Sequence, residues 1–291
     1  MKILFAIPHY YHYEAGGRFC SLAQEPQVRK KAVAACLSAL WNIFGREQRM
    51  LHIARRAAIP ANQDLSHDVD VVVCTTRGQH LLDQLPVPAQ LYTHHATQVE
   101  PLLLGFECQA LLRDALGRYD YYAYLEDDLI LLDPCFFHKL AWFDSIAGFE
   151  SLLQPNRYEV ADSMVARKVY VDGDLRPRVT SGVREVQASP EITAEAFGAP
   201  VRFRPALNPH SGCYFLTAEQ MTYWAGQSYF LDRDTSFIGP LESAATLGIF
   251  RAFSVYKPVR EQAGFLEIQH VGTQFLNQVG TELPLADNDP S

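Results

Sequence analysis

Three consecutive carboxylates, Glu126, Asp127 and Asp128, are the side chains best placed to do chemistry. Apolar residues precede and follow them, and this pattern predicts a strand over residues 121–132. Charges inside a sheet are costly unless they are paired or bound to a metal. A hard divalent cation takes one or two carboxylates together with phosphate oxygens. We therefore expect a Mg²⁺ or Mn²⁺ site for a nucleoside diphosphate; the alternative is a solvated acidic turn before a helix capped by Asp133.

The elements around this acidic segment favour an α/β fold. Strand and helix alternate three times, which is typical of a parallel sheet whose ligands bind at the carboxyl ends of its strands. The second half is less regular, with a loop over 190–209 and a Thr217 helix cap supported by Gln220. Strands are expected at 3–8, 69–76, 90–93, 121–132 and 213–216, and helices at 26–44, 46–58, 103–116, 135–146 and 240–250.

Charge and composition exclude several classes of protein. The chain has 291 residues and a formal net charge of −8, which argues against a nucleic-acid binder. Residues 1–60 carry a net +6 and residues 61–291 a net −14, so the basic part is either a solvated helix face or a surface for an anionic ligand. Motifs of P-loop NTPases, dinucleotide-binding folds, serine hydrolases and zinc ribbons are absent from the sequence. Without a signal peptide or an apolar span, we expect a cytoplasmic protein.

The order of the motifs resembles that of nucleotide-sugar glycosyltransferases with the GT-A fold. The segment Glu126–Phe137 is similar to the EDD region of the N-acetylglucosaminyltransferase I type, a variant of the D-x-D motif. The segment Ile7–Tyr11 is similar to the I-P-x-Y-N opening of many GT-A enzymes, with Tyr11 in place of Asn. The resemblance implies a GT-A-like, mostly parallel sheet flanked by helices. It also implies a single domain over 1–280, divided into a nucleotide-binding half (1–135) and an acceptor-binding half (136–280), and we expect a disordered tail at 281–291.

The resemblance also implies an activity and a metal site. The enzyme would use Mn²⁺ or Mg²⁺ to move a sugar from a nucleoside diphosphate sugar to a hydroxyl of a glycan, a lipid-linked molecule or a protein. Asp128 would be the direct metal ligand, with Glu126 and Asp127 at the ribose or, through water, at the metal. His270 is a candidate for a further metal ligand or diphosphate contact, although a lone histidine is equally well explained as a structural residue.

Several residues are candidates for contacts to the donor. Arg18, after two glycines, could clamp a phosphate, whereas Arg29 is expected on the solvated face of the first helix with its two lysine neighbours. Ser211 and Gly212 would let the backbone approach the donor sugar, or would form a simple turn before a strand. The remaining candidates would hold the nucleobase at the ends of the first and second strands: Pro8, His9, Tyr10, Thr75 and Thr76.

The catalytic base is assigned by position to Glu242. In an inverting enzyme this residue would deprotonate the acceptor hydroxyl. Ser243 stands where the family motif usually has a second acid, so Asp232 and Asp234 remain alternatives to Glu242, as does a surface role for Glu242.

Two other functions share these features. A sugar nucleotidyltransferase would also use a metal and carboxylates, but it should have a Gly-rich, Arg-containing loop after the first strand, of which 16–18 is a faint echo. A non-catalytic carbohydrate- or cation-binding protein could keep the same fold.

Overall fold

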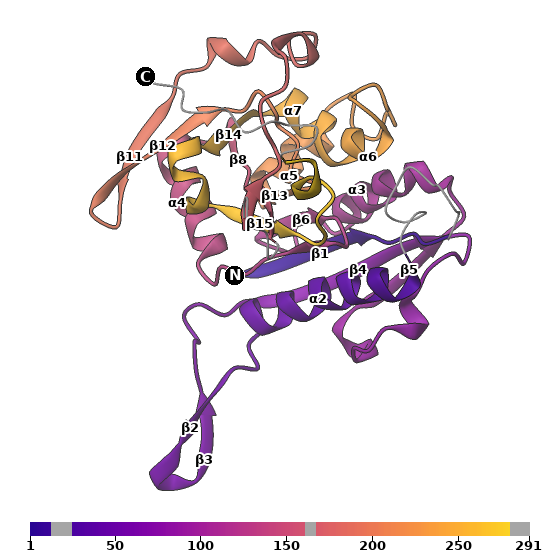
Figure 1. The fold of residues 1–291 in the computed structure, drawn as a ribbon, viewed down its shortest axis with the longest axis vertical. Coiled ribbons are helices and arrows are strands. Elements are labelled where there is room, and N and C mark those ends of the chain that lie inside the picture. Colours follow the sequence, from indigo (N-terminus) through magenta and orange to yellow (C-terminus); the bar gives the residue numbers. More distant parts are fainter. Residues whose placement is uncertain (13–24, 161–166, 280–291) are drawn as a thin grey trace.

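A five-stranded sheet forms the centre of the molecule (Figure 1). The computed structural model describes residues 1–12, 25–160 and 167–279. Four neighbouring strands are parallel and the fifth, β13, is antiparallel to β6. Their order is β13 (Cys213–Thr217), β6 (Tyr121–Leu125), β1 (Lys2–Pro8), β4 (Asp68–Thr76) and β5 (Thr93–Thr97). Strands β1 and β6 are buried along nearly their whole length, as is typical of strands covered by helices on both faces.

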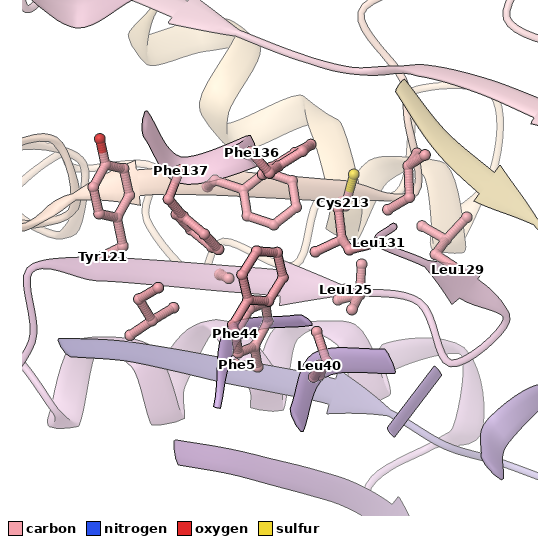
Figure 2. Close-up of a cluster of buried hydrophobic side chains, with 14 of the residues drawn as sticks. Phe5, Leu40, Phe44, Tyr121, Leu125, Leu129, Leu131, Phe136, Phe137 and Cys213 are labelled. Atoms are coloured by element: carbon pink, nitrogen blue, oxygen red, sulfur yellow. The ribbon is translucent and has the colours of Figure 1, made fainter. Parts of the chain in front are cut away.

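Helices on opposite faces create two hydrophobic cores. One core packs α2 (Pro26–Phe44) and α4 (Phe136–Ala147) against the sheet, and Figure 2 shows its aromatic centre around Phe44 and Phe137. The other core lies under α3 (Leu104–Asp114) and α5 (Ala218–Ala225). The capping box expected from Thr217 and Gln220 is present at the start of α5.

The strand order reverses beside β1. The chain runs from β1 outward to β4 and β5, and then returns to place β6 on the other side of β1. In open α/β sheets, ligands bind in the crevice at the carboxyl ends of strands where the order reverses in this way. The topology therefore points to the ends of β1 and β6, which are Pro8 and Leu125.

Two further four-stranded sheets take their strands mainly from the second half, and both mix parallel and antiparallel pairs. The fold is thus mixed α/β, with its parallel part concentrated in the central sheet. One sheet has the order β10 (Lys168–Tyr170), β9 (Asn156–Val160), β15 (Glu267–His270) and β7 (Leu129–Ile130). The other has the order β11 (Ile192–Ala196), β12 (Ala199–Pro205), β14 (Ser254–Pro258) and β8 (Ser151–Leu153).

The prediction of one strand over 121–132 was wrong. Strand β6 ends at Leu125, residues 126–128 turn, and β7 joins a different sheet by pairing with β15. Apolar residues flank the acids on both sides because each flank is buried in its own sheet. The carboxylates therefore occupy the crossing between two sheets.

Two segments form hairpins instead of the predicted helix and loop. Residues 46–58 do not form a helix, because Gly45 has extended dihedrals and β2 (Arg49–His52) pairs with β3 (Ala57–Pro60) across the turn η1 (Ile53–Arg55). The predicted loop at 190–209 contains β11 and β12, whose alternate residues Val201 and Phe203 point into the core.

The strand predicted at 90–93 begins at Thr93, since a 3₁₀ turn, η3 (Ala89–Leu91), precedes it.

The segment predicted as one helix over 240–250 has three parts. They are α6 (Pro240–Glu242), the π-helical turn η7 (Ser243–Leu247) and α7 (Gly248–Ala252).

No helix in the described ranges is long and apolar enough to cross a membrane. The remaining short 3₁₀ turns are η2 (Leu82–Gln84), η4 (Pro101–Leu103), η5 (Pro177–Val179), η6 (Val186–Ala188), η8 (Arg260–Phe265) and η9 (Leu276–Gln278).

Candidate functional site

A cavity of about 350 Å³ opens at the ends of β1 and β6, where the strand order reverses. Seven residues singled out in the sequence line it together: Pro8, Tyr10, Glu126, Asp127, Asp128, Glu242 and His270. The other lining residues come from segments far apart in the chain: Arg29, Pro101, Leu104, Gly105, Tyr124, Arg157, His210, Leu241, Gln274 and Phe275. Carboxylates, guanidinium groups, and aromatic and aliphatic side chains thus line the same cavity.

Arg29 holds the acidic turn from the first turn of α2. Its Nη1 donates to Asp128 Oδ2 at 2.8 Å, and its Nη2 donates to Asp127 Oδ1. The side chain is buried, so the expectation that Arg29 belongs to a solvated helix face was wrong. The planar guanidinium fork reaches two carboxylates at once, which a lysine ammonium would not do with the same geometry.

Asp127 is held on both of its oxygens. His9 Nδ1 lies 2.5 Å from Asp127 Oδ2, while the Leu81 backbone N–H donates to His9 Nε2 at 3.0 Å. Because Nε2 accepts a hydrogen bond, a neutral His9 carries its proton on Nδ1 and donates it to Asp127. His9 is fully buried and does not line the cavity. In this structure its ring contacts Asp127 and the Leu81 backbone, and a contact to a nucleobase stays a prediction.

Asp128 differs from Asp127 because one of its oxygens has no partner among the described atoms. Oδ2 accepts from Arg29, whereas the buried Oδ1 has no hydrogen-bond partner among the described atoms. Burial raises the pKa of Asp128, but the opposite charges of Arg29 and His270 outweigh it and hold the pKa below its ordinary value. Asp128 is therefore an anion that lines the cavity and whose buried Oδ1 is left without a partner in the described structure.

His270 faces Asp128 with a fixed ring. Glu159 Oε1 lies 2.9 Å from His270 Nδ1, and Glu159 Oε2 accepts from the Leu276 N–H at 2.8 Å. This leaves His270 Nε2 pointing toward Asp128 Oδ2 at 3.9 Å. Burial lowers the pKa of His270, but the bond to Glu159 and the charge of Asp128 raise it overall. A carboxylate behind a histidine is the arrangement that orients imidazole metal ligands.

These side chains fit a divalent cation only in part. Asp128 and His270 offer one oxygen and one nitrogen, and within residues 1–12, 25–160 and 167–279 no group of three His, Cys, Asp or Glu is placed to hold a metal. Mg²⁺ commonly takes one or two carboxylates and completes its shell with water and substrate phosphates. The residues therefore fit a cation that arrives with a phosphorylated ligand.

Glu126 lies beside the backbone of Gly212. Burial and the negative charge of Asp128 raise the pKa of Glu126 to about 7, although Arg157 acts to lower it. Arg157 Nη1 lies 3.8 Å from Glu126 Oε2. Gly212 has φ +62°, and a Cβ there would overlap the Glu126 carboxylate. The glycine thus makes room for Glu126, and a close approach of a donor sugar to this backbone stays a prediction.

A second cationic group, which the sequence did not reveal, borders the cavity. Arg157 donates through Nε and Nη2 to Asp172 Oδ1 at 2.9 and 2.8 Å, and Lys257 Nζ lies 3.2 Å from Asp172 Oδ2. Burial opposes ionisation of Asp172, yet Arg157 and Lys257 hold its pKa well below the ordinary value. Arg157 and Lys257 share one carboxylate here, and Arg157 is the member of the group that lines the cavity.

His210 lies between this group and the turn η7. Its backbone oxygen accepts from Lys257 Nζ at 2.7 Å, and its Nδ1 is 2.9 Å from Thr246 Oγ1. Burial and the nearby Arg157 lower the pKa of His210 well below its ordinary value, so the ring at the cavity is neutral.

The three candidates for the catalytic base lie in different places. Glu242 ends α6 and lines the cavity. Asp232 and Asp234 lie outside it, where they accept hydrogen bonds from Arg251 at 2.8 and 2.5 Å. The assignment to Glu242 stays a prediction, and it is the one that the cavity accommodates.

Four other predicted donor contacts lie outside the cavity lining or outside the described residues. Thr75 Oγ1 lies 2.7 Å from His94 Nε2, and Thr76 Oγ1 donates to the Val99 carbonyl at 2.6 Å. Ser211 Oγ donates to the Pro155 carbonyl at 2.8 Å. Arg18 falls in 13–24, and the tail 281–291 is likewise outside the described ranges.

Arg29, Arg157 and His210 escaped prediction because each reads as ordinary in its local segment. Arg29 stands in a basic run, and Arg157 shares a short strand with an acid, Glu159. A charged residue alternating inward within the buried segment 156–159 is the one local signal that would have marked Arg157.

Neither a scan of protein-family models nor a search of curated proteins gives a match to this chain. Among solved structures, the chain is similar at 12% identity to S. aureus TarS, with a TM-score of 0.31 over 54% of this chain and 22% of that one. It is also similar at 12% identity to S. aureus TarS 1–349 in complex with UDP-GlcNAc, with a TM-score of 0.29 over 57% of this chain and 37% of that one. The chain thus spans well under half the length of either structure. TM-scores this low do not show a shared fold.

Proposed function

We propose that this protein is a glycosyltransferase that uses a nucleoside diphosphate sugar as donor and a hydroxyl group as acceptor. The observation that carries the proposal is Asp128, which lines a cavity at the strand-order reversal and whose buried Oδ1 has no partner in the described structure. The EDD motif in the sequence resembles the D-x-D region of GT-A enzymes, and the mixed α/β fold is compatible with that class.

The donor would be bound by groups of three kinds. Arg29 and Arg157, the two arginines that line the cavity, would attract the diphosphate by charge. Asp128 and His270 would hold a divalent cation, which when bound neutralises negative charge on the diphosphate leaving group. Pro8 and Tyr10, at the end of β1, would contact the nucleobase. His9 and Glu159 would act as positioning residues, since they orient Asp127 and His270.

Glu242 would remove the proton from the acceptor hydroxyl as that oxygen attacks the sugar. This requires a carboxylate exposed to the cavity, and Glu242 has that position. The buried Glu126, with its pKa raised to about 7, would be a weaker candidate because Arg157 and Gly212 already surround it. The proposal thus describes an inverting transfer in which Glu242 is the base.

A panel of UDP-, GDP- and CMP-sugars, each assayed with and without Mn²⁺, tests this function. We expect one donor to be bound and slowly hydrolysed in the presence of Mn²⁺. Release of pyrophosphate from a nucleoside triphosphate and a sugar phosphate would identify a nucleotidyltransferase instead. Binding of sugars without any hydrolysis or transfer would identify a non-catalytic protein.

Two substitutions test the assigned roles. Asp128→Asn keeps the shape of the side chain and should reduce Mn²⁺-dependent donor binding by more than about tenfold. Asp174→Asn, at a surface carboxylate paired with Arg204, should leave binding unchanged. Glu242→Gln should lower kcat by about 100-fold or more while donor binding is retained. Unchanged metal-dependent binding in Asp128→Asn would contradict the metal assignment.

A further inference from the structure

The β2–β3 hairpin stands away from the rest of the molecule (Figure 1). Its two strands pair with each other and form a sheet of their own. An isolated two-stranded hairpin is at best marginally stable in water, and unpaired strand edges favour further association. An element of this kind is expected to contact something besides solvent.

The hairpin exposes large apolar side chains that are normally buried. Met50 is 60% exposed, Leu51 73% and Ile53 79%, and Ile59 is also exposed. A cluster of this size on one protruding element marks an interaction site, unlike single apolar residues scattered over a surface.

The apolar side chains lie on both faces of the hairpin. Met50 is paired with Ile59, and the next pair, Leu51 with Ala58, points to the opposite face because side chains alternate along a strand. A hairpin that docks on a protein surface needs one apolar face. Apolar residues on both faces suit an element that enters an apolar medium from its tip.

Basic residues accompany the apolar ones. The segment 45–61 contains four arginines and a single acid, Glu47, which pairs with Arg49. Arg55 and Arg56 lie at the tip, where among the described contacts neither forms an ion pair with a carboxylate. Like charges disfavour pairing of this hairpin with the same hairpin of another copy. Arginine next to apolar residues is well suited to a boundary between lipid phosphates and acyl chains.

We propose that the β2–β3 hairpin docks the protein onto an anionic lipid surface. Leu51 and Ile53 enter the boundary between headgroups and acyl chains, while Arg55 and Arg56 pair with lipid phosphates. The proposal does not depend on the enzymatic activity proposed above, since it concerns an element outside the cavity.

Co-sedimentation of the full chain with vesicles tests the proposal. Vesicles of phosphatidylcholine with about one third phosphatidylglycerol supply the anionic surface, and pure phosphatidylcholine vesicles supply the neutral one. We expect binding to the anionic vesicles, weakened by added salt, and at least about tenfold weaker binding to the neutral ones. Equal binding to both, or binding to neither, would overturn the proposal.

Matched variants separate this hairpin from general charge and apolarity. Arg55→Glu/Arg56→Glu should reduce anionic-vesicle binding by more than about tenfold, whereas Arg176→Glu/Arg178→Glu, with the same change of charge elsewhere on the surface, should reduce it far less. Leu51→Ser/Ile53→Ser should also reduce binding, whereas Phe197→Ser, at the exposed tip of the β11–β12 hairpin, should not.

Sedimentation velocity without vesicles tests whether a second copy of the chain covers the β2–β3 hairpin. The proposal expects the same oligomeric state for the wild-type chain and for Leu51→Ser/Ile53→Ser. Conversion of a wild-type dimer to a monomer by this variant, with vesicle binding unchanged, would show that a second copy covers the hairpin and would overturn the proposal.

Discussion

At the scale of single residues, neighbouring carboxylates have different tasks. Asp127 is bonded on both oxygens, to Arg29 and His9, so it anchors the turn. Asp128 shares Arg29 but keeps Oδ1 without a partner in the described structure. The difference follows from the position of each side chain on the turn, since the two residues have the same chemistry.

Gly212 offers a test of how the backbone makes room for Glu126. In Gly212→Ala the new methyl group would overlap the Glu126 carboxylate, and a φ of +62° disfavours alanine. We expect a loss of about 1–3 kcal/mol in the free energy of unfolding, measured by urea titration. Gly173→Ala, where a Cβ meets nothing within 4 Å, is the control. If overlap is the cause, adding Glu126→Ala should recover part of the loss; full additivity would contradict this explanation.

His67 predicts a pH dependence of stability. It is buried among Phe44, Phe137 and His138, neither ring nitrogen has a described partner, and burial lowers its pKa from 6.5 to about 4. Between these values the unfolded chain binds a proton that the folded chain does not, so His67 makes stability fall as the pH drops from about 6.5 to 4.

The comparison of His67→Phe with the wild-type chain isolates this contribution. The variant should lose less stability than the wild-type chain between pH 7 and pH 5, as measured by urea unfolding at each pH. His95→Gln, at an exposed histidine, should show the wild-type dependence. An identical pH dependence in wild type and His67→Phe would mean that other groups cause it.

At the scale of elements, the site depends on where helices and strands begin and end. Arg29 lies in the first turn of α2, and the acids lie where β6 ends and β7 begins. Buried ion pairs therefore join the helix to the turn. Removal of one partner of such a pair leaves the other charge buried and uncompensated.

Replacement of Arg29 tests this link between α2 and the acidic turn. Arg29→Met would leave Asp127 and Asp128 buried without their cation, and we expect a loss of about 3–5 kcal/mol in unfolding free energy. Millimolar Mn²⁺ should restore part of the Tm, because a cation then compensates the carboxylates. Lys31→Met, at an exposed position of the same helix, should change stability by less than about 0.5 kcal/mol. A stability of Arg29→Met equal to that of the control would show that the ion pair is not required.

At the scale of the whole molecule, the two proposed halves share their sheets. Strand β6 of the first half pairs with β13 of the second, and β7 pairs with β15. The core under α2 likewise includes Phe203, Phe215 and Ile268 from the second half. Separation of the halves would expose apolar surface and unpaired strand edges on both.

The fragment 1–135 is therefore expected not to fold cooperatively. Thermal unfolding followed by circular dichroism should give a broad transition or none for the fragment and a single steep transition for the full chain. A fragment with a transition as steep as that of the full chain would show that the nucleotide-binding half is an independent domain.

The sequence by itself determined the α/β class, the apolar strands of the central sheet and the acidic segment 126–128, because these depend on local periodicity and on carboxylates clustered between apolar runs. It also identified seven residues that line the cavity. Only the tertiary structure decided that Arg29 and Arg157 face these acids, that Gly212 accommodates Glu126 and that β2 and β3 form a protruding hairpin. These features arise from contacts between segments distant in the chain or from the lack of them, and local residue patterns carry no record of such contacts.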